Sequence, residues 1–230
     1  MHLRDLTQFL NELEQNNNRA WFVMNRPRYD ILRDEFLQTV TELIAAIGRF
    51  DPAVRLCNPK KAVFRINRDV RFSHDKNPYK TVFSAAILPN DLKRPSEGGG
   101  PCYYLHIDGH GNCHFGGGEY MPPPYRVKAI RNHIINDADG FARMLQNKAL
   151  KNLYGDFQPE HKLTRVPKGF APDTPHAEYL KLKSFFIWTE VKLDLNAPEK
   201  LVPDLASSFA AALPMIHWLR SVPCDAPLDD

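Results

Sequence analysis

The period of the hydrophobic pattern changes twice along this chain, and that change limits the folds open to it. Near both ends, apolar residues recur at helical spacing, most clearly over residues 29–47. In the middle third the pattern alternates instead, so that Phe64 and Ile66 face one way and Arg65 faces the other. Helices, then strands, then helices are typical of an α+β fold.

The expected elements follow from these periods and from the turn residues between them. Helices are predicted at about 3–13, 27–48, after the prolines at 122–124, at 141–150 and at 205–219. Strands are predicted at 62–67, 81–88, 103–107, 112–115 and 184–188. The strand at 81–88 is apolar on both faces, so we expect it to be central. Short connections favour antiparallel pairing.

No composition break or internal repeat marks a second domain. We therefore predict one α+β domain over residues 1–221, with a mostly antiparallel sheet in the middle of the chain and helices at both ends. Residues 222–230 are expected to form a frayed tail, and 89–101 a mobile loop.

Bulk composition is that of an ordinary soluble protein, with 43% hydrophobic and 25% charged residues among 230. No apolar run approaches the ~20 residues that a membrane helix needs, and the N-terminus has no apolar signal core. The four cysteines form no Cys-x-x-Cys pair, which indicates a reducing compartment. We expect a cytoplasmic protein without a membrane partner.

Positive charge is concentrated in one window, residues 60–80, which holds seven basic and two acidic residues. This window carries +5 whereas the whole chain carries +3, so the remainder is slightly acidic. Guanidinium groups bind phosphate or carboxylate at two points, and lysine adds a point charge. The basic residues predicted to hold an anionic ligand are Arg65, Arg68, Arg71, Lys76 and Lys80.

Other residues are predicted to act beside these. Asp69 could orient an arginine or act as a base, and Tyr79 could orient the ligand or move a proton. The alternative is an internal network in which Asp69 and Asp75 pair with arginines. Two acids cannot neutralise seven bases, however, so some positive charge is left over. Arg165, Lys168 and Lys183 either complete this basic site or are solvated surface charges.

A hairpin is predicted around residues 108–111. If its loop is three residues long, His106 pairs with His114 on the face opposite Leu105 and Ile107. His106 is a candidate acid, base or phosphate donor, although a half-buried, hydrogen-bonded histidine is the more ordinary interpretation. No histidine spacing supports a metal site, and we predict none.

Three consecutive glycines, 116–118, precede the helix that follows the prolines at 122–124. A glycine loop can cradle an anion at a helix N-terminus. Neither a Walker sequence nor a dinucleotide fingerprint is present, so no nucleotide cofactor is predicted. Close packing of the glycines against a neighbouring segment is the favoured interpretation.

Several segments, in order, resemble a widespread family known as domain of unknown function 2461. The matching pieces are Phe9-Leu10, residues 16–22, 64–81, 103–107, 116–118, 165–170 and 181–185. The resemblance spans nearly the whole chain and implies a single-domain cytoplasmic α+β protein. It implies no activity.

The sequence therefore predicts an electropositive pocket for a small anionic ligand, either phosphate-bearing or a nucleotide, in a protein that is a hydrolase or a transferase if it has turnover. The alternative is a non-enzymatic module that binds nucleic acid or protein through the same basic strip. A concave site favours the small ligand, whereas a convex strip favours a polymer. A purely structural network is the third option.

Overall fold

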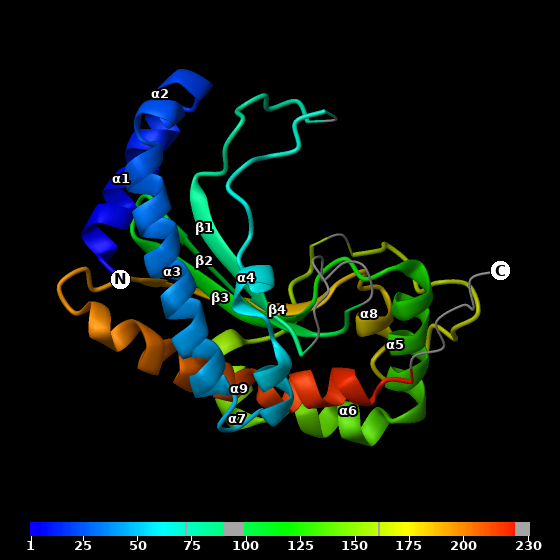
Figure 1. The fold of residues 1–230 in the computed structure, drawn as a ribbon. Coiled ribbons are helices and arrows are strands. Elements are labelled where there is room, and N and C mark those ends of the chain that lie inside the picture. Colours follow the sequence, from blue (N-terminus) through cyan, green and yellow to red (C-terminus); the bar gives the residue numbers. More distant parts are fainter. Residues whose placement is uncertain (72, 90–98, 161, 224–230) are drawn as a thin grey trace. The chain divides into compact units, whose positions relative to one another are not determined.

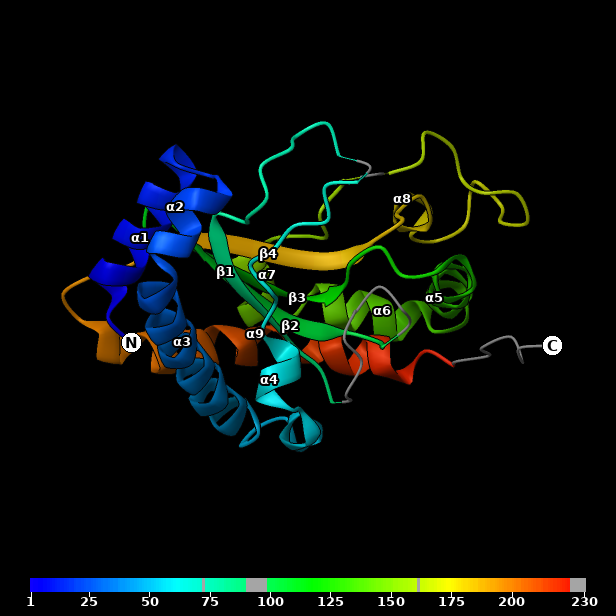
Figure 2. The same cartoon turned by 45° about the horizontal axis from the view of Figure 1, so that its top comes forward.

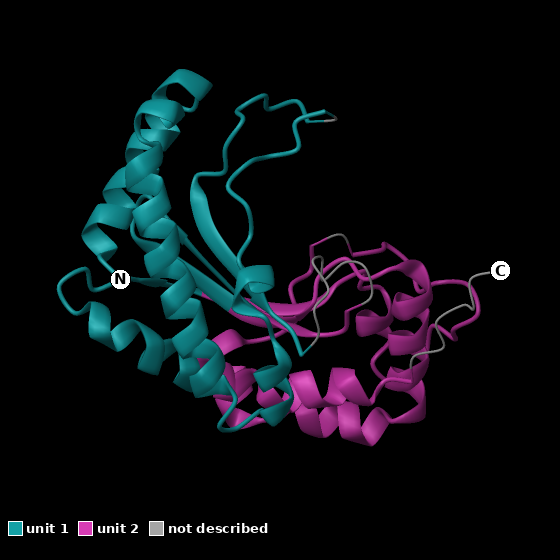
Figure 3. Cartoon of the chain, viewed as in Figure 1, with its two compact units in different colours: residues 1–91, 104–115, 190–207 teal, residues 92–103, 116–189, 208–230 magenta. Residues whose placement is uncertain are grey.

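The computed structural model describes residues 1–71, 73–89, 99–160 and 162–223. The chain divides into two compact units, each built from three separate stretches (Figure 3). Unit 1 comprises residues 1–91, 104–115 and 190–207; unit 2 comprises 92–103, 116–189 and 208–230. The predicted α+β class is confirmed, with an antiparallel sheet in the middle of the chain and helices towards both ends.

Within the described residues the sheet has four strands in the order β1-β2-β3-β4 (Figure 1). The strands are β1 (Val82–Ile87), β2 (Cys102–Asp108), β3 (Asn112–Glu119) and β4 (Phe185–Lys192). Residues 109–111 join β2 to β3, which confirms the predicted hairpin. The expectation that residues 81–88 form a central strand is wrong, because β1 stands first in the strand order.

The strand expected over 62–67 is reduced to two isolated antiparallel bridges, Val63 to Ala85 and Asn67 to Tyr79. Their registers differ by two residues, so no continuous ladder can run through both. Pro59–Ala62 forms the short helix α4, which removes Ala62 from the expected strand. These bridges still align residues 63–67 along the outer side of β1.

Unit 1 contains the N-terminal helices. They are α1 (Leu3–Gln15), α2 (Arg19–Met24) and α3 (Arg26–Ile47), followed by a 3-10 turn at Pro52–Leu56. Both views show α1 beside α3 (Figures 1 and 2). The predicted stripe of α1 is confirmed, since its four members are fully buried: Leu6, Phe9, Leu10 and Leu13. Phe36 of α3 packs edge-on against Phe83 of β1, with 5.4 Å between ring centroids.

Unit 2 contains α5 (Pro124–Asn136), α6 (Ala138–Leu145), α7 (Lys148–Tyr154), α8 (Ala177–Leu180) and most of α9 (Leu201–Ser221), which begins in unit 1 after a turn at Pro198–Lys200. The single helix predicted over 141–150 is wrong. Asn147 interrupts it, because its side chain accepts a hydrogen bond from the Leu150 amide and starts α7 anew. None of the described helices is long and apolar enough to span a bilayer.

A buried ion pair fixes the end of α9 within unit 2. The guanidinium of Arg126 donates to the Glu119 carboxylate at 2.6 Å, and both side chains are about 95% buried or more. Arg126 also donates to the carbonyl of Leu219 at 2.7 Å and to that of Val222 at 3.1 Å. Buried charges require partners of this kind, and these bonds satisfy carbonyls at the C-terminal end of the helix. Val222, which belongs to the predicted tail, is 3% exposed. Residues 224–230 of the predicted tail and 90–98 of the predicted loop lie outside the described residues.

The three glycines lie in β3, where the strand approaches β4 closely within unit 2. A Cβ on Gly116 would stand 1.9 Å from the carbonyl oxygen of Ile187, and one on Gly118 would stand 2.2 Å from that of Phe185. Gly118 also has φ +122°, which side chains rarely adopt. Close packing of the glycines is thus confirmed as their role in the fold.

Replacing Gly116 with alanine is expected to destabilise the protein by about 3 kcal/mol or more, because a backbone oxygen of β4 cannot move aside as a flexible side chain can. Urea unfolding measures this. Gly48→Ala is the control, since its φ of −60° suits any residue and its Cβ would meet chiefly the flexible side chain of Arg55. Equal losses in the two variants would contradict the close approach.

Candidate anion-binding site

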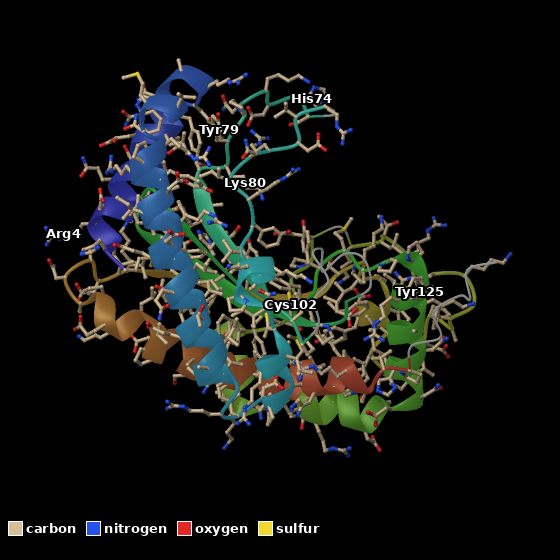
Figure 4. All side chains as sticks on the ribbon, in the orientation of Figure 1. Arg4, His74, Tyr79, Lys80, Cys102 and Tyr125 are labelled. Atoms are coloured by element: carbon tan, nitrogen blue, oxygen red, sulfur yellow. The ribbon has the colours of Figure 1, made fainter. Side chains whose placement is uncertain are left out.

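Residues 65–71 and 73–80 of unit 1 belong to a hairpin-like projection, here named the basic arm, that extends beyond β1 (Figures 1 and 2). Its base is held by backbone hydrogen bonds: the Arg68 amide donates to the Pro78 carbonyl at 2.9 Å, and the Lys80 amide donates to the Ile66 carbonyl at 2.8 Å. Tyr79 and Lys80 lie near β1, whereas His74 lies further out (Figure 4). The arm therefore has a base that backbone hydrogen bonds join and a tip that includes residues 69–71 and 73–77.

Asn17 joins the base of the arm to the start of α2. Its side-chain amide donates to the Tyr79 carbonyl at 3.0 Å, and its side-chain oxygen accepts from the Tyr79 amide at 3.1 Å. The Tyr79 ring stacks on Phe22 of α2 at 4.0 Å and is 7% exposed. We call these two hydrogen bonds the Asn17 clasp. They hold the residue next to Lys80 at a fixed position on unit 1.

Both acids of the arm are used at its tip. Asp75 pairs with Arg68, which also lies 3.4 Å from the Ser73 hydroxyl. Asp69 accepts two hydrogen bonds from the Arg71 guanidinium, at 2.9 and 2.6 Å. Two of the three arginines thus follow the internal-network interpretation. Their predicted part in ligand binding stays a prediction.

The cations at the base of the arm are arranged differently. Among the described residues, no carboxylate lies within ion-pair distance of Arg65 or Lys80. The Lys80 ammonium lies 4.9 Å from the centre of the Phe64 ring. Burial lowers the pKa of Lys80, and the positive charge of Arg65 lowers it further. Arg65 also lowers the pKa of Asp69, so its charge acts both on Lys80 and, beyond ion-pair distance, on one acid of the arm. At the tip, the Lys76 ammonium donates to the Val70 carbonyl at 3.1 Å.

A line of rings continues from Lys80 across the sheet face of unit 1. We name it the ring ladder; its members are Phe64, Tyr104, His106 and His114. The ring centroids are 6.3 Å apart from Phe64 to Tyr104, 5.7 Å from Tyr104 to His106, and 4.3 Å from His106 to His114. All four side chains are half-buried, whereas Leu105 and Ile107 on the opposite face are fully buried. The conditional pairing of His106 with His114 is confirmed.

His106 is the most strongly perturbed group of the ladder. Burial, and then the charge of His114, lower its pKa to about 4, so its imidazole is neutral near pH 7. Its Nδ1 lies 3.2 Å from the Tyr104 hydroxyl. His114 Nε2 lies 3.2 Å from Glu190, which ends the ladder on β4. No set of three or more His, Cys, Asp or Glu side chains in the described part of the chain could hold a metal ion.

Residues 5–218 match the family model described as conserved hypothetical protein (DUF2461). The chain belongs to this family. No curated protein and no solved structure matches it significantly. The family segments 16–22 and 64–81 are those that the Asn17 clasp joins.

The remaining predicted ligands lie in unit 2. Arg165 and Lys168 are exposed on the stretch between α7 and α8, and Lys183 is exposed just before β4. Their convergence with the basic arm stays a prediction.

The tentative catalytic residues differ in their surroundings. The hydrogen bonds from Arg71 lower the pKa of Asp69 to about 2, which makes its carboxylate a weak base. Tyr79 is enclosed between Phe22 and the clasp, so its hydroxyl is carried on a ring that is fixed by packing. His106 combines partial exposure with a neutral ring. His106 has an unprotonated ring near pH 7, but the burial that lowers its pKa also makes it a weaker base than an exposed histidine.

A Ser-His-Asp grouping in unit 2 was not found from the sequence. His133 Nε2 lies 3.1 Å from the Ser221 hydroxyl and 4.0 Å from Asp137. A nucleophilic triad uses one imidazole nitrogen for each partner, whereas here Nε2 faces both. The Ser221 hydroxyl donates to the Trp218 carbonyl, and Asp137 accepts from the Trp218 indole. This grouping ties α5 to α9.

Cysteine chemistry is equally disfavoured. Cys102 and Cys113 are buried in β2 and β3, and burial raises the pKa of each thiol to about 12. The thiolate is the nucleophilic form of cysteine, so neither is suited to attack at neutral pH.

Asn17→Ala is expected to release the basic arm. Loss of both clasp bonds should destabilise the protein by about 2 kcal/mol and speed amide hydrogen exchange at the arm base. Asn16→Ala is the matched control, because the Asn16 side chain donates to the Glu12 carbonyl of α1 and takes no part in the clasp. Unchanged exchange at Arg68 and Lys80 in the Asn17 variant would contradict the clasp.

The protein is expected to lose stability as pH falls from about 6.5 to about 4. Because the pKa of His106 is lower in the folded state, the unfolded state binds more protons in this window, and the free energy of unfolding decreases with falling pH. The loss is about 2 kcal/mol after allowance for solvent screening. Urea unfolding from pH 4 to pH 7 measures it. His106→Gln should flatten the profile, and His74→Gln, at an exposed position, should not; identical slopes in all three proteins would refute the assignment.

Proposed function

We propose that this protein binds a small phosphate-bearing anion at the base of the basic arm, with Arg65 and Lys80 as its principal ligands. One observation carries the proposal. Among the described residues neither cation has a carboxylate at ion-pair distance, and the half-buried Lys80 ammonium lies 4.9 Å from the centre of the Phe64 ring. The positive charge of Arg65 also lowers the pKa of Lys80. A bound anion would relieve that repulsion.

The chemistry of the two side chains suits phosphate. A guanidinium presents two parallel donors to phosphate oxygens, and an ammonium adds a compact point charge. Lys80 is half-buried, so its charge is less screened than that of an exposed lysine. Lys76 would add to the positive potential around the arm.

Hydrolysis or transfer of a phosphate-bearing group is the reaction class that we propose for such a site. This chemistry depends on positioning and charge more than on a protein nucleophile. His106 would be the proton acceptor, since its imidazole is unprotonated near pH 7, although its lowered pKa makes it a weaker base than an exposed histidine. We also propose a cytoplasmic location, supported by the reduced, buried Cys102 and Cys113.

A second candidate is non-enzymatic binding of nucleic acid. The observation that favours it is the projecting form of the arm, with exposed Arg71, His74 and Lys76 near its tip (Figure 4). A polymer that contacts several phosphates loses affinity steeply as salt rises. A small anion bound at Arg65 and Lys80 releases fewer counterions, so its affinity depends less steeply on salt concentration.

A thermal-shift screen with inorganic phosphate, sugar phosphates and nucleotides tests the proposal. At ligand concentrations 100-fold above Kd, binding should stabilise the wild type by about 2.7 kcal/mol. Arg65→Ala should abolish the rise in Tm because it removes the two-point donor. Arg26→Ala, an exposed arginine of unit 1 that pairs with Asp30, should keep it. A wild type that no anion stabilises, or an Arg65 variant that responds fully, would overturn the proposal.

A further inference from the structure

Lys80 has surroundings that differ from those of an ordinary surface lysine. Its side chain is half-buried, and its ammonium lies 4.9 Å from the centre of the Phe64 ring. Within the described part of the chain, no oxygen accepts a hydrogen bond from this ammonium and no carboxylate pairs with it. A lysine ammonium has three donors, so the protein leaves the polar end of Lys80 to solvent or to a ligand.

Two features of the site favour the neutral amine over the ammonium. Burial lowers the pKa of Lys80, and the positive charge of Arg65 lowers it further. The face of Phe64 attracts a cation and acts in the opposite direction. Burial and a neighbouring cation are the two means by which proteins make a lysine nucleophilic toward carbonyl compounds.

The backbone at Lys80 is held on both sides, so the amine extends from a fixed position. The Asn17 clasp holds Tyr79, and the Lys80 amide donates to the Ile66 carbonyl at 2.8 Å. A covalent step is fast only when the reacting groups are held in place relative to each other. The base of the arm meets that condition on the protein's side.

We propose that Lys80 is a nucleophilic amine that forms an imine with a small aldehyde or ketone whose phosphate is bound by Arg65. This inference rests on the proposed function for the phosphate and adds a covalent step to it. It narrows the ligand from any phosphate-bearing anion to a phosphate-bearing carbonyl compound, the class to which open-chain sugar phosphates belong.

The step balances without a further reagent. The lone pair of the neutral Lys80 amine attacks the carbonyl carbon, and the π electrons of the C=O bond move to the oxygen, which gains a proton. The carbinolamine then loses water, so that both hydrogens of the amine leave with the carbonyl oxygen and a C=N bond remains. A protonated imine is a cation, so the attraction between Lys80 and the bound phosphate is kept after the bond forms.

Reductive trapping with sodium cyanoborohydride near neutral pH tests the inference. The reagent delivers hydride to the imine and converts it to a stable secondary amine, which peptide mass spectrometry locates. The probes are glyceraldehyde 3-phosphate and glyceraldehyde, which lacks the phosphate. Lys200 of unit 1 and Lys148 of unit 2 are exposed and serve as controls within the same molecule.

We expect glyceraldehyde 3-phosphate to label Lys80 at least about tenfold faster than Lys148 or Lys200. Effective concentrations of well-placed groups reach about 10⁵ M or more, which outweighs the charge that a bound phosphate returns to the amine. Arg65→Ala should remove this advantage, whereas Arg26→Ala, at an exposed arginine that pairs with Asp30, should retain it. Competition by inorganic phosphate is the second measurement if the Arg65 variant fails to fold, and it should slow the labelling of Lys80 in the wild type.

The outcomes separate this inference from the proposed function. If Lys80 is labelled no faster than the two control lysines, the reactive amine is refuted, while a rise in Tm with phosphate that depends on Arg65 leaves the anion site standing. If both aldehydes label Lys80 equally fast and phosphate gives no rise in Tm, the amine stands, and the phosphate-bearing substrate class fails together with the anion site.

Discussion

The two hydrogen bonds of the Asn17 clasp are the contact on which the candidate site depends. An irregular projection such as the basic arm, joined to the sheet by isolated bridges, would otherwise have few tertiary contacts to hold it. The clasp pairs an asparagine side chain with both backbone groups of Tyr79, as a neighbouring strand would. Because Lys80 follows Tyr79 directly, the same contact positions the ammonium over Phe64.

The short turn between β2 and β3 determines which rings lie along the sheet beside Lys80. Asp108 accepts hydrogen bonds from the amides of His110 and Asn112 and so closes a three-residue loop. That loop length places His106 opposite His114, and a change of one residue would move one of the two rings to the other face. The ring ladder is thus a consequence of register, and the register follows from one aspartate at the end of β2.

The sequence was sufficient wherever structure is decided locally. The stripe of α1, the hairpin at 109–111 and the packing of the glycines in β3 all follow from periodicity and turn chemistry, and all are confirmed. The place of β1 in the strand order was not predicted, because it depends on which distant segment pairs with that strand. The break at Asn147 was not predicted, because it depends on a single helix cap. The clasp joins residues 62 apart in sequence, and no local pattern marks such a pair. The alternating pattern places Phe64 on one face of its segment. Had Phe64 been grouped with Tyr104 and His106, the ring ladder could have been predicted from the sequence.

The positions of the two acids in the arm determine which of its basic residues have an acidic partner. Asp75 and Asp69 pair with Arg68 and Arg71, whereas neither Arg65 nor Lys80 has a carboxylate at ion-pair distance among the described residues. The uncompensated charge therefore lies on the part of the arm that backbone bonds and the clasp hold in place. A ligand that binds preordered groups gives up less free energy to ordering them. On this reasoning the base of the arm is a better binding site than its tip, although the tip is more exposed and carries more charged groups.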